Sequence, residues 1–309
     1  MPKTIVVGID GSTAGESAIT WAAHRAARQR RVLEIMHVID DNWGALGTRQ
    51  LAELHPEALE LVTESAALAA SVEPDVECLV RVEVGDPIVE LVSASRAAHM
   101  VVVGTHKTGF FHGRALGSRS LQLAAASRCP VAIIPGFTNS QRDGIIVGLD
   151  DSVGGEAALA FAARESRELR KSLVLLQAMA PSRRPWLRPT LTDAEASASE
   201  ALSVRAMERV RALGVTHNVR VRLVHRPPAE ALIDAAAHSD LLVLGSTRRS
   251  GADITLLGPV VHDVLMNITG PTVVVHGVSS GQGGSLVPKG ARRLIHADGV
   301  TTEHERSTL

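Results

Sequence analysis

A pattern of about 140 residues occurs twice along this chain. The segment IVVGIDGSTAGESAITWAAHRAA at Ile5–Ala27 returns as IIVGLDDSVGGEAALAFAARES at Ile145–Ser166. Further glycines and prolines recur at an offset of 141, at positions 87/228, 104/245, 117/258 and 130/271. One inserted residue over that distance indicates a duplicated domain. The sequence therefore predicts two copies of one fold, which we place at residues 1–139 and 140–278, followed by a flexible tail at 279–309.

Composition narrows the class of protein. Apolar residues make up 45% of the 309 residues and aromatic residues only 2%, so we expect aliphatic cores. The net charge of −1 offers no field that would attract nucleic acid or an anionic membrane. No run approaches the roughly 20 apolar residues of a membrane span, and no leader precedes the first strand pattern. We expect a soluble cytoplasmic protein, with Cys78 and Cys129 as buried apolar residues rather than a disulfide.

Short apolar runs alternate with helical patterns in both halves. Runs rich in Val and Ile and apolar on both faces are typical of parallel strands covered by helices on each side. The stretches between them carry apolar residues at helical spacing, as Ala18, Trp21, Ala22 and Ala26 do. Thr13 and Glu16 have the spacing of a capping box for the first helix. The pattern predicts two doubly wound α/β domains, each with a five-stranded parallel sheet and helices on both faces. The expected strands are residues 5–9, 32–38, 76–82, 100–103 and 131–134, then 145–149, 173–178, 219–224, 241–244 and 272–275.

Ligands of doubly wound sheets bind outside the carboxyl ends of the strands, where the strand order reverses. The first strand of the chain ends in Gly8-Ile9-Asp10-Gly11-Ser12. Asp10, Gly11 and Ser12 are therefore candidate binding residues.

The loop after the fourth strand contains residue types that commonly bind phosphate. It reads GTHKTGFFHGRALGSRS over residues 104–120 and leads into an apolar helix. Glycines let backbone amides approach an anion, and a helix start adds unpaired N–H groups. Ser118 and Ser120 add hydroxyls, and Lys107 and Arg114 add positive charge. A tight loop without a ligand is the alternative, because neither a P-loop nor a GxGxxG fingerprint is present.

These residues resemble the nucleotide signature of the universal stress protein family, G-x2-G-x9-G-[S/T], over roughly residues 3–277. The resemblance implies the strand order 3-2-1-4-5 in each domain and pairing of the two domains through their last strands. It implies an adenine nucleotide as ligand, and we expect ATP, alone or with Mg²⁺. Asp10 matches the ribose-facing acid and Val38 the adenine-side residue. The phosphate-side residues of the first copy are Gly104, Lys107, Gly113, Gly117, Ser118, Arg119 and Ser120.

The second copy departs further from the signature. It offers Asp150, Ala178, Gly245, Arg248 and Gly258 as binding residues, but Pro259 replaces the Ser/Thr. Both copies place a cation, Lys107 or Arg248, where the family has its second glycine. We interpret the cation of the first copy as a phosphate contact. We therefore expect binding in the first domain and weaker or no binding in the second.

The leading functional hypothesis is an ATP-binding stress-response regulator with little or no turnover. A slow ATPase or nucleotidyl transferase is the alternative, with His106 or His112 as the base. A scaffold protein that binds no nucleotide is the third hypothesis. His37 is read as a core histidine, and no zinc spacing or hydrolase elbow is present. A receiver-domain reading fails because the second half has no acid after its third strand. An intrachain pseudo-dimer, a homodimer and an unknown protein partner are further expectations.

Overall fold

The computed structural model describes residues 4–41, 44, 46–105, 118–136, 142–179, 193–216, 218–249 and 257–279. Strands and helices alternate throughout this part of the chain. The first half contains β1 (Ile5–Ile9), α1 (Thr13–Gln29), β2 (Leu33–Asp40), α2 (Thr48–Val72), β3 (Cys78–Gly85), α3 (Pro87–Ala94), β4 (Met100–Thr105), α4 (Ser118–Ala126) and β5 (Val131–Pro135). The second half contains β6 (Ile145–Gly148), α5 (Val153–Leu169), β7 (Leu173–Ala178), α6 (Asp193–Ala212), β8 (Val219–Val224), α7 (Pro228–Ala236), β9 (Leu241–Arg249), α8 (Pro259–Met266) and β10 (Thr272–Ser279).

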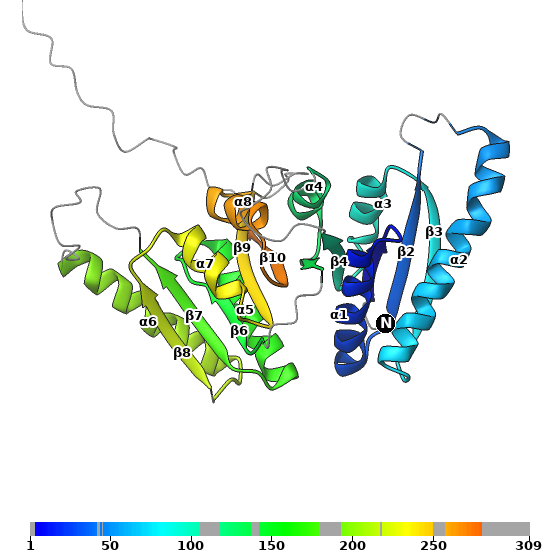
Figure 1. The fold of residues 1–309 in the computed structure, drawn as a ribbon. Helices are drawn as coiled ribbons and strands as arrows, with labels where there is room; N and C mark the ends of the chain where they lie inside the picture. Colours follow the sequence, from blue (N-terminus) through cyan, green and yellow to red (C-terminus); the bar gives the residue numbers. More distant parts are fainter. Residues whose placement is uncertain are drawn as a thin grey trace, which may run out of the picture.

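All ten strands form one continuous sheet in the order β3-β2-β1-β4-β5-β10-β9-β6-β7-β8. Each half thus has the expected order 3-2-1-4-5, and its strands are parallel. The halves meet where β5 and β10 pair antiparallel, with Thr272 opposite Ile133. Figure 1 shows the two halves side by side, related as a pseudo-dimer within one chain. The predicted fold class and the predicted pairing through the last strands are therefore confirmed.

Helices cover both faces of this sheet, and a separate core fills each side. One core joins α1, α2, α5 and α6 to the sheet, with Ile5, Leu33 and Leu173 among its fully buried side chains. The other joins α3, α4, α7 and α8, with Leu123 and Leu265 fully buried. The expectation of aliphatic cores holds, since Phe161 is the one buried aromatic side chain among the described residues.

The first helix of each half is capped by a serine. The Ser12 hydroxyl accepts a hydrogen bond from the Gly15 amide at 3.2 Å, and Ser152 does the same for Gly155 at 2.9 Å. Thr13 lies inside the helix, so the capping box predicted at Thr13 and Glu16 is wrong. The cap is one residue earlier because Ser12 already has the extended backbone that an N-cap requires.

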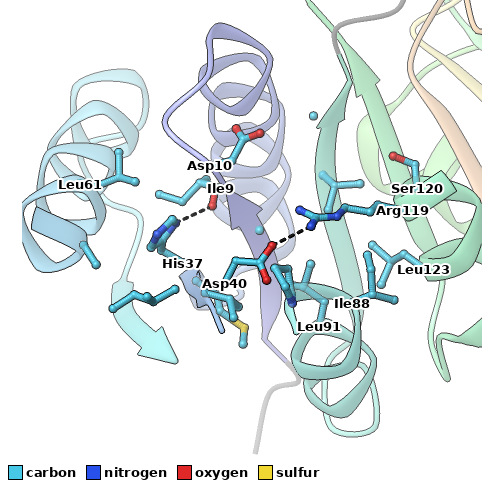
Figure 2. Close-up of a pocket in the computed structure, with 18 of the residues that line it drawn as sticks. Ile9, Asp10, His37, Asp40, Leu61, Ile88, Leu91, Arg119, Ser120 and Leu123 are labelled. Carbon is cyan, nitrogen blue, oxygen red and sulfur yellow. Dashed lines mark hydrogen bonds and ion pairs between the residues drawn. The ribbon is translucent and has the colours of Figure 1, made fainter. Parts of the chain in front are cut away.

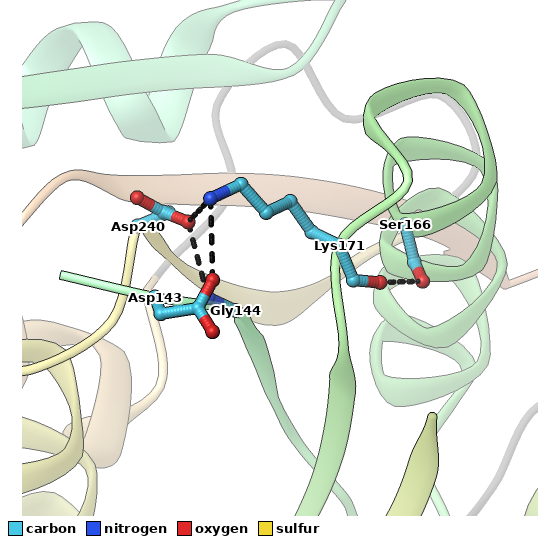
Figure 3. A network of polar contacts seen from close by, with 5 residues as sticks. All are labelled: Asp143, Gly144, Ser166, Lys171 and Asp240. Carbon is cyan, nitrogen blue, oxygen red and sulfur yellow. Dashed lines mark hydrogen bonds and ion pairs between the residues drawn. The ribbon is translucent and has the colours of Figure 1, made fainter. Parts of the chain in front are cut away.

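Charged side chains fix the point where the chain enters the second half (Figure 3). Lys171 Nζ lies 3.2 Å from Asp143 Oδ1 and 2.9 Å from Asp240 Oδ2. The Gly144 amide also donates to Asp240, at 3.0 Å. The hydrogen bond with Asp240 raises the pKa of Lys171 above its usual value, so its charge persists. The start of β6 is thereby tied to the loop before β9.

Two strands of the second half run further than the sequence predicts. We expected them to end at residues 244 and 275, but β9 continues to Arg249 and β10 to Ser279. The two extensions pair with each other in parallel, from Gly245 opposite Val275 to Arg249 opposite Ser279. Apolar runs mark only the part of each strand that is covered on both faces, so the polar continuation carries no such signal.

Two further expectations concern cysteines and membrane spans. Cys78 and Cys129 are free thiols, as expected, but both are partly exposed rather than buried. Within the described ranges, no helix is both long and apolar enough to cross a membrane.

Candidate functional site

A cleft opens at the carboxyl ends of β1, β2 and β4 in the first half, where the strand order reverses. It encloses about 730 Å³, within the usual range for a small-molecule site. Figure 2 shows its lining side chains converging from the sheet, from α2 and from α4. Of the residues predicted from the sequence, it brings together Asp10, Val38, Gly104, Arg119 and Ser120.

Asp10 follows β1 directly and lies exposed at the cleft. Its Oδ1 accepts a hydrogen bond from the Ser12 amide at 3.1 Å, which fixes the carboxylate in the turn. Gly11 has φ of +76°, a conformation that favours glycine. Gly11 and Ser12 belong to this turn but do not line the cleft, and the Ser12 hydroxyl is occupied as the helix cap.

Gly104 is required by packing as much as by any ligand. A Cβ at this position would overlap the carbonyl oxygen of Ala14, because α1 begins directly against the end of β4. In the second half, a Cβ at Gly245 would overlap the backbone of Gly154 in the same way. The glycine shared by both repeats thus lets the first helix approach the fourth strand.

The walls of the cleft are mainly apolar. Val38, Leu61 and Leu91 line it from β2, α2 and α3. His37 lies beside them, and its Nδ1 is 2.9 Å from the Ile9 carbonyl oxygen (Figure 2). Since a carbonyl only accepts, Nδ1 carries the proton. The histidine is satisfied, as expected, but it is half-buried and faces the cleft rather than the core.

The start of α4 supplies positive charge. Arg119 Nη2 lies 2.7 Å from Asp40 Oδ2, so this ion pair crosses the cleft from α4 to the end of β2 (Figure 2). Both side chains are substantially exposed, at 58% and 36%. Ser120 lines the cleft one residue further along the helix. Lys107, Gly113, Gly117, His106 and His112 lie outside the described residues, as does the side chain of Ser118.

With this geometry established, comparison with known proteins identifies the family. The profile of the Universal stress protein family matches residues 1–135 and again 142–276. The chain belongs to the universal stress protein family.

Relatives share the tandem arrangement. Universal stress protein Rv2623 of Mycobacterium tuberculosis (strain ATCC 25618 / H37Rv) is 30% identical over 290 residues, covering 87% of this chain and 95% of the relative. Universal stress protein Rv2005c of the same strain is 29% identical over 290 residues, covering 87% and 96%. Among solved structures, a universal stress protein from Archaeoglobus fulgidus DSM 4304 superposes with a TM-score of 0.70 at 20% identity, covering 88% of this chain and 98% of that one. At that identity the likeness supports the fold alone.

The second universal stress protein repeat keeps the turn after its first strand but differs at the start of its last helix. Asp150 keeps its turn, with Oδ1 accepting from the Ser152 amide at 3.1 Å and the Ser152 hydroxyl at 2.7 Å. A cleft on the second repeat encloses about 360 Å³, and none of the predicted residues lines it. Asp150, Ala178, Gly245 and Gly258 line neither this cleft nor that of the first repeat.

The two repeats also carry different side chains at equivalent positions. Val260 and Val261 occupy the positions of Arg119 and Ser120 at the repeat offset of 141. Gly258 caps α8 without a side-chain hydrogen bond, and Pro259 begins the helix. Gln177, which replaces His37, is buried and accepts hydrogen bonds from two serines of α6. The start of α8 therefore lacks the charge and hydroxyl that α4 presents.

The predicted role of Arg248 as a binding residue is wrong. We expected it to face a ligand in its own repeat, yet it is 5% exposed and points into the first repeat. Its Nη2 donates to the carbonyl oxygens of Ala125 at 3.2 Å and Ser127 at 2.6 Å. The reason is the extension of β9, which makes Arg248 a strand residue opposite Val278.

Several residues that line the cleft were not predicted from the sequence. Leu54, Glu57 and Leu61 enter the cleft from α2, and the sequence did not mark them as binding residues. Asp40 was visible as one of two adjacent acids, but its contact with Arg119 was not. No group of three or more metal-binding side chains occurs among the residues that the structure describes.

Proposed function

We propose that the first repeat binds an adenine nucleotide, with ATP as the expected ligand. The observation that supports this most is the cleft at the reversal of strand order, where an apolar wall, a carboxylate and a cationic helix start meet. The whole chain would then act as an ATP-binding stress-response regulator. The proposed division into domains remains 1–139, 140–278 and a tail at 279–309.

The chemistry of the lining residues fits the three parts of such a ligand. Val38 and Leu61 offer an apolar surface to a base. Asp10 holds the Ser12 amide through Oδ1, which leaves Oδ2 without a hydrogen bond from the described residues and able to accept from ribose hydroxyls. Arg119 and Ser120, at the N-terminal end of α4, offer charge and a donor to phosphate oxygens.

Calorimetric titration with ATP tests this proposal. Val38→Trp fills the cleft and should abolish measurable binding, whereas Ala178→Trp, at the equivalent position of the second repeat, should leave the affinity of the first repeat intact. Arg119→Gln should weaken binding of ATP by about tenfold, the loss expected for one charge-assisted contact. Equal affinity of wild type and Val38→Trp would remove the cleft as the site.

We further propose that turnover is slow or absent. The two described residues proposed to meet the phosphates, Arg119 and Ser120, are not general bases at neutral pH. Of the carboxylates in the lining, Asp10 is assigned to the ribose and Asp40 is paired with Arg119. Steady-state phosphate release measures turnover directly, with His106→Ala and His112→Ala as the informative variants. Release well above one per minute that falls in either variant would favour the enzyme hypothesis.

A nucleotide-free scaffold is the competing role. Native mass spectrometry of protein purified without added nucleotide separates the two, because a co-purifying adenylate appears as added mass. Cytoplasmic localisation, a homodimer and a protein partner stay predictions, and the intrachain pairing of β5 with β10 leaves the outer edges β3 and β8 open to other contacts.

A further inference from the structure

Helix α4 belongs to the first repeat but is held at its far end by the second. Its first turns line the cleft through Arg119, Ser120 and Leu123. Its last turn lies against the extensions of β9 and β10. Figure 1 shows α4 between the two halves, next to β10 and α8. The helix therefore joins the candidate binding site to the other repeat.

Two side chains of the second repeat make this contact. Arg248 donates to the carbonyl oxygens of Ala125 and Ser127 at 3.2 and 2.6 Å. His276 Nε2 lies 2.7 Å from the carbonyl oxygen of Ala124. The last carbonyls of a helix have no partner within it, and they carry its negative dipole end. A guanidinium and an imidazole N–H are thus well matched to the end of α4.

The surroundings of both side chains indicate a fixed contact rather than a mobile one. Arg248 is 5% exposed, and His276 is half-buried. Burial, followed by the nearby charge of Arg248, lowers the pKa of His276 to about 4, although the hydrogen bond to Ala124 opposes this shift. The ring is therefore neutral at pH 7, and its Nε2–H can donate.

Within the described residues, this contact runs from strands of the second repeat to a helix of the first. At the repeat offset, the counterpart of His276 is Pro135, which has no side-chain donor. The strand β5 ends at Pro135, whereas β10 continues to Ser279. The extensions that carry Arg248 and His276 toward α4 are described in the second repeat, whose own helix start has valines in place of Arg119 and Ser120.

We propose that the second repeat is a positioning domain for the ligand site of the first, and that Arg248 and His276 do this by holding the carboxyl end of α4. This inference rests on the proposed nucleotide binding. The nine residues of α4 form a rigid rod of about 13 Å, so a shift at Ala125 reaches Arg119 and Ser120. Displacements of about 0.5 Å are enough to disturb a binding constellation.

The test compares ATP affinity in three full-length proteins by calorimetry. Arg248→Met removes both hydrogen bonds and should weaken ATP binding about fivefold, at the lower end of typical couplings between sites. Arg248→Lys keeps the charge and one donor and should recover part of the loss. Arg142→Met is the matched control, because Arg142 also donates to a carbonyl oxygen, that of Thr269 at 2.9 Å, but this bond lies within the second repeat.

A second measurement follows the helix itself. Hydrogen exchange of the amides at 121–126, without ligand, should accelerate in Arg248→Met and not in Arg142→Met. His276→Leu removes only the contact to Ala124. This variant replaces Arg248→Met in both measurements if Arg248→Met does not fold. The readout excludes a merely structural role, since general destabilisation would affect the control as well.

The outcomes separate this inference from the proposed function. No binding of ATP by wild type would refute the proposed function, and the inference with it. Binding by wild type with equal affinity in Arg248→Met would overturn the inference alone. Faster exchange in α4 with unchanged affinity would also overturn it, since the helix end would then be held without consequence for the ligand.

Discussion

Asp40 and a ligand phosphate would compete for the same cation. Asp40→Asn should strengthen ATP binding about threefold to tenfold, because it releases Arg119 from its 2.7 Å contact and removes a negative charge beside the phosphates. Calorimetric titration at low ionic strength measures the change most clearly, since salt screens exposed charges.

The matched control for this prediction lies in the second repeat. Asp151 forms an exposed ion pair with Arg205 at 2.8 Å, so Asp151→Asn should leave ATP affinity unchanged. Weaker binding in Asp40→Asn would mean that Asp40 positions Arg119 for the ligand rather than withholding it.

Gly104 provides a prediction about stability. Gly104→Ala places a Cβ against the backbone of Ala14, and neither the strand nor the helix start can yield easily. We expect a loss of about 2–3 kcal/mol in the free energy of unfolding, as for other overpacked positions. Urea denaturation measures it, with Gly136→Ala as the control, because a Cβ there meets nothing within 4 Å. Equal stability of the two variants would contradict the packing argument.

At the level of residues, the sequence predicted which positions follow the strands, but it did not predict contacts between side chains far apart along the chain. Asp10 and Gly104 follow apolar strands, so their meeting at one sheet edge was predictable from topology. The ion pair of Asp40 and Arg119 joins residues 79 positions apart and depends on where α4 starts, which no periodicity reports. The prediction of weaker binding in the second repeat came from Pro259, which stands at the position of Ser118 in the first repeat, and it stays a prediction.

Among the structural elements, β10 carries a pH-dependent contact. The folded-state pKa of His276, about 4, is lower than the 6.5 of a free histidine. Unfolded chains therefore bind more protons between these values, and the free energy of unfolding should rise with pH across pH 4 to 6.5. The contribution at pH 7 is at most about 3 kcal/mol, and it is lost as pH falls.

Urea denaturation at several pH values checks this prediction. His276→Gln keeps a side-chain donor but does not titrate, so its stability should depend less on pH over this interval. His225→Gln, at an exposed position after β8, should follow wild type. A pH profile of His276→Gln that matches wild type would show that other groups dominate.

The elements themselves were largely predictable, and their ends were not. All ten strands overlap the expected runs. Burial on both faces requires continuous apolar sequence in the inner strands, whereas the edge strands β3 and β8 are largely exposed. The polar ends of β9 and β10 extend the sheet because they pair with each other. Since each end is a strand only in the presence of the other, neither sequence predicts the extension by itself. The same extension turns Arg248 from a loop residue into a strand residue, which explains why its predicted role was wrong.

On the scale of the whole molecule, the two repeats have diverged at a shared position. Arg25 and Glu165 are equivalent at the offset of 140, and they meet where α1 packs against α5. Arg25 Nε lies 2.9 Å from Glu165 Oε2, and Gln29 donates to Glu165 Oε1 at 2.7 Å. The guanidinium also stacks on Trp21, 3.7 Å from the ring centre. Identical repeats would place like charges here, so the pair favours association of unlike repeats.

Removing one partner of this pair should be costly. The two side chains are 8% and 3% exposed, and burial lowers the pKa of Arg25 while Glu165 opposes that shift. Glu165→Gln leaves a buried cation without its counter-charge, so we expect the free energy of unfolding to fall by about 3 kcal/mol. Replacing both residues, as in Arg25→Met with Glu165→Met, should recover most of the loss, because no uncompensated charge remains. Glu53→Gln breaks the exposed Arg49–Glu53 pair and should change stability by less than about 0.5 kcal/mol. If the double variant were as unstable as Glu165→Gln, the ion pair itself would be needed to join the repeats, and divergence toward opposite charge would be a condition of folding rather than a means of choosing the partner.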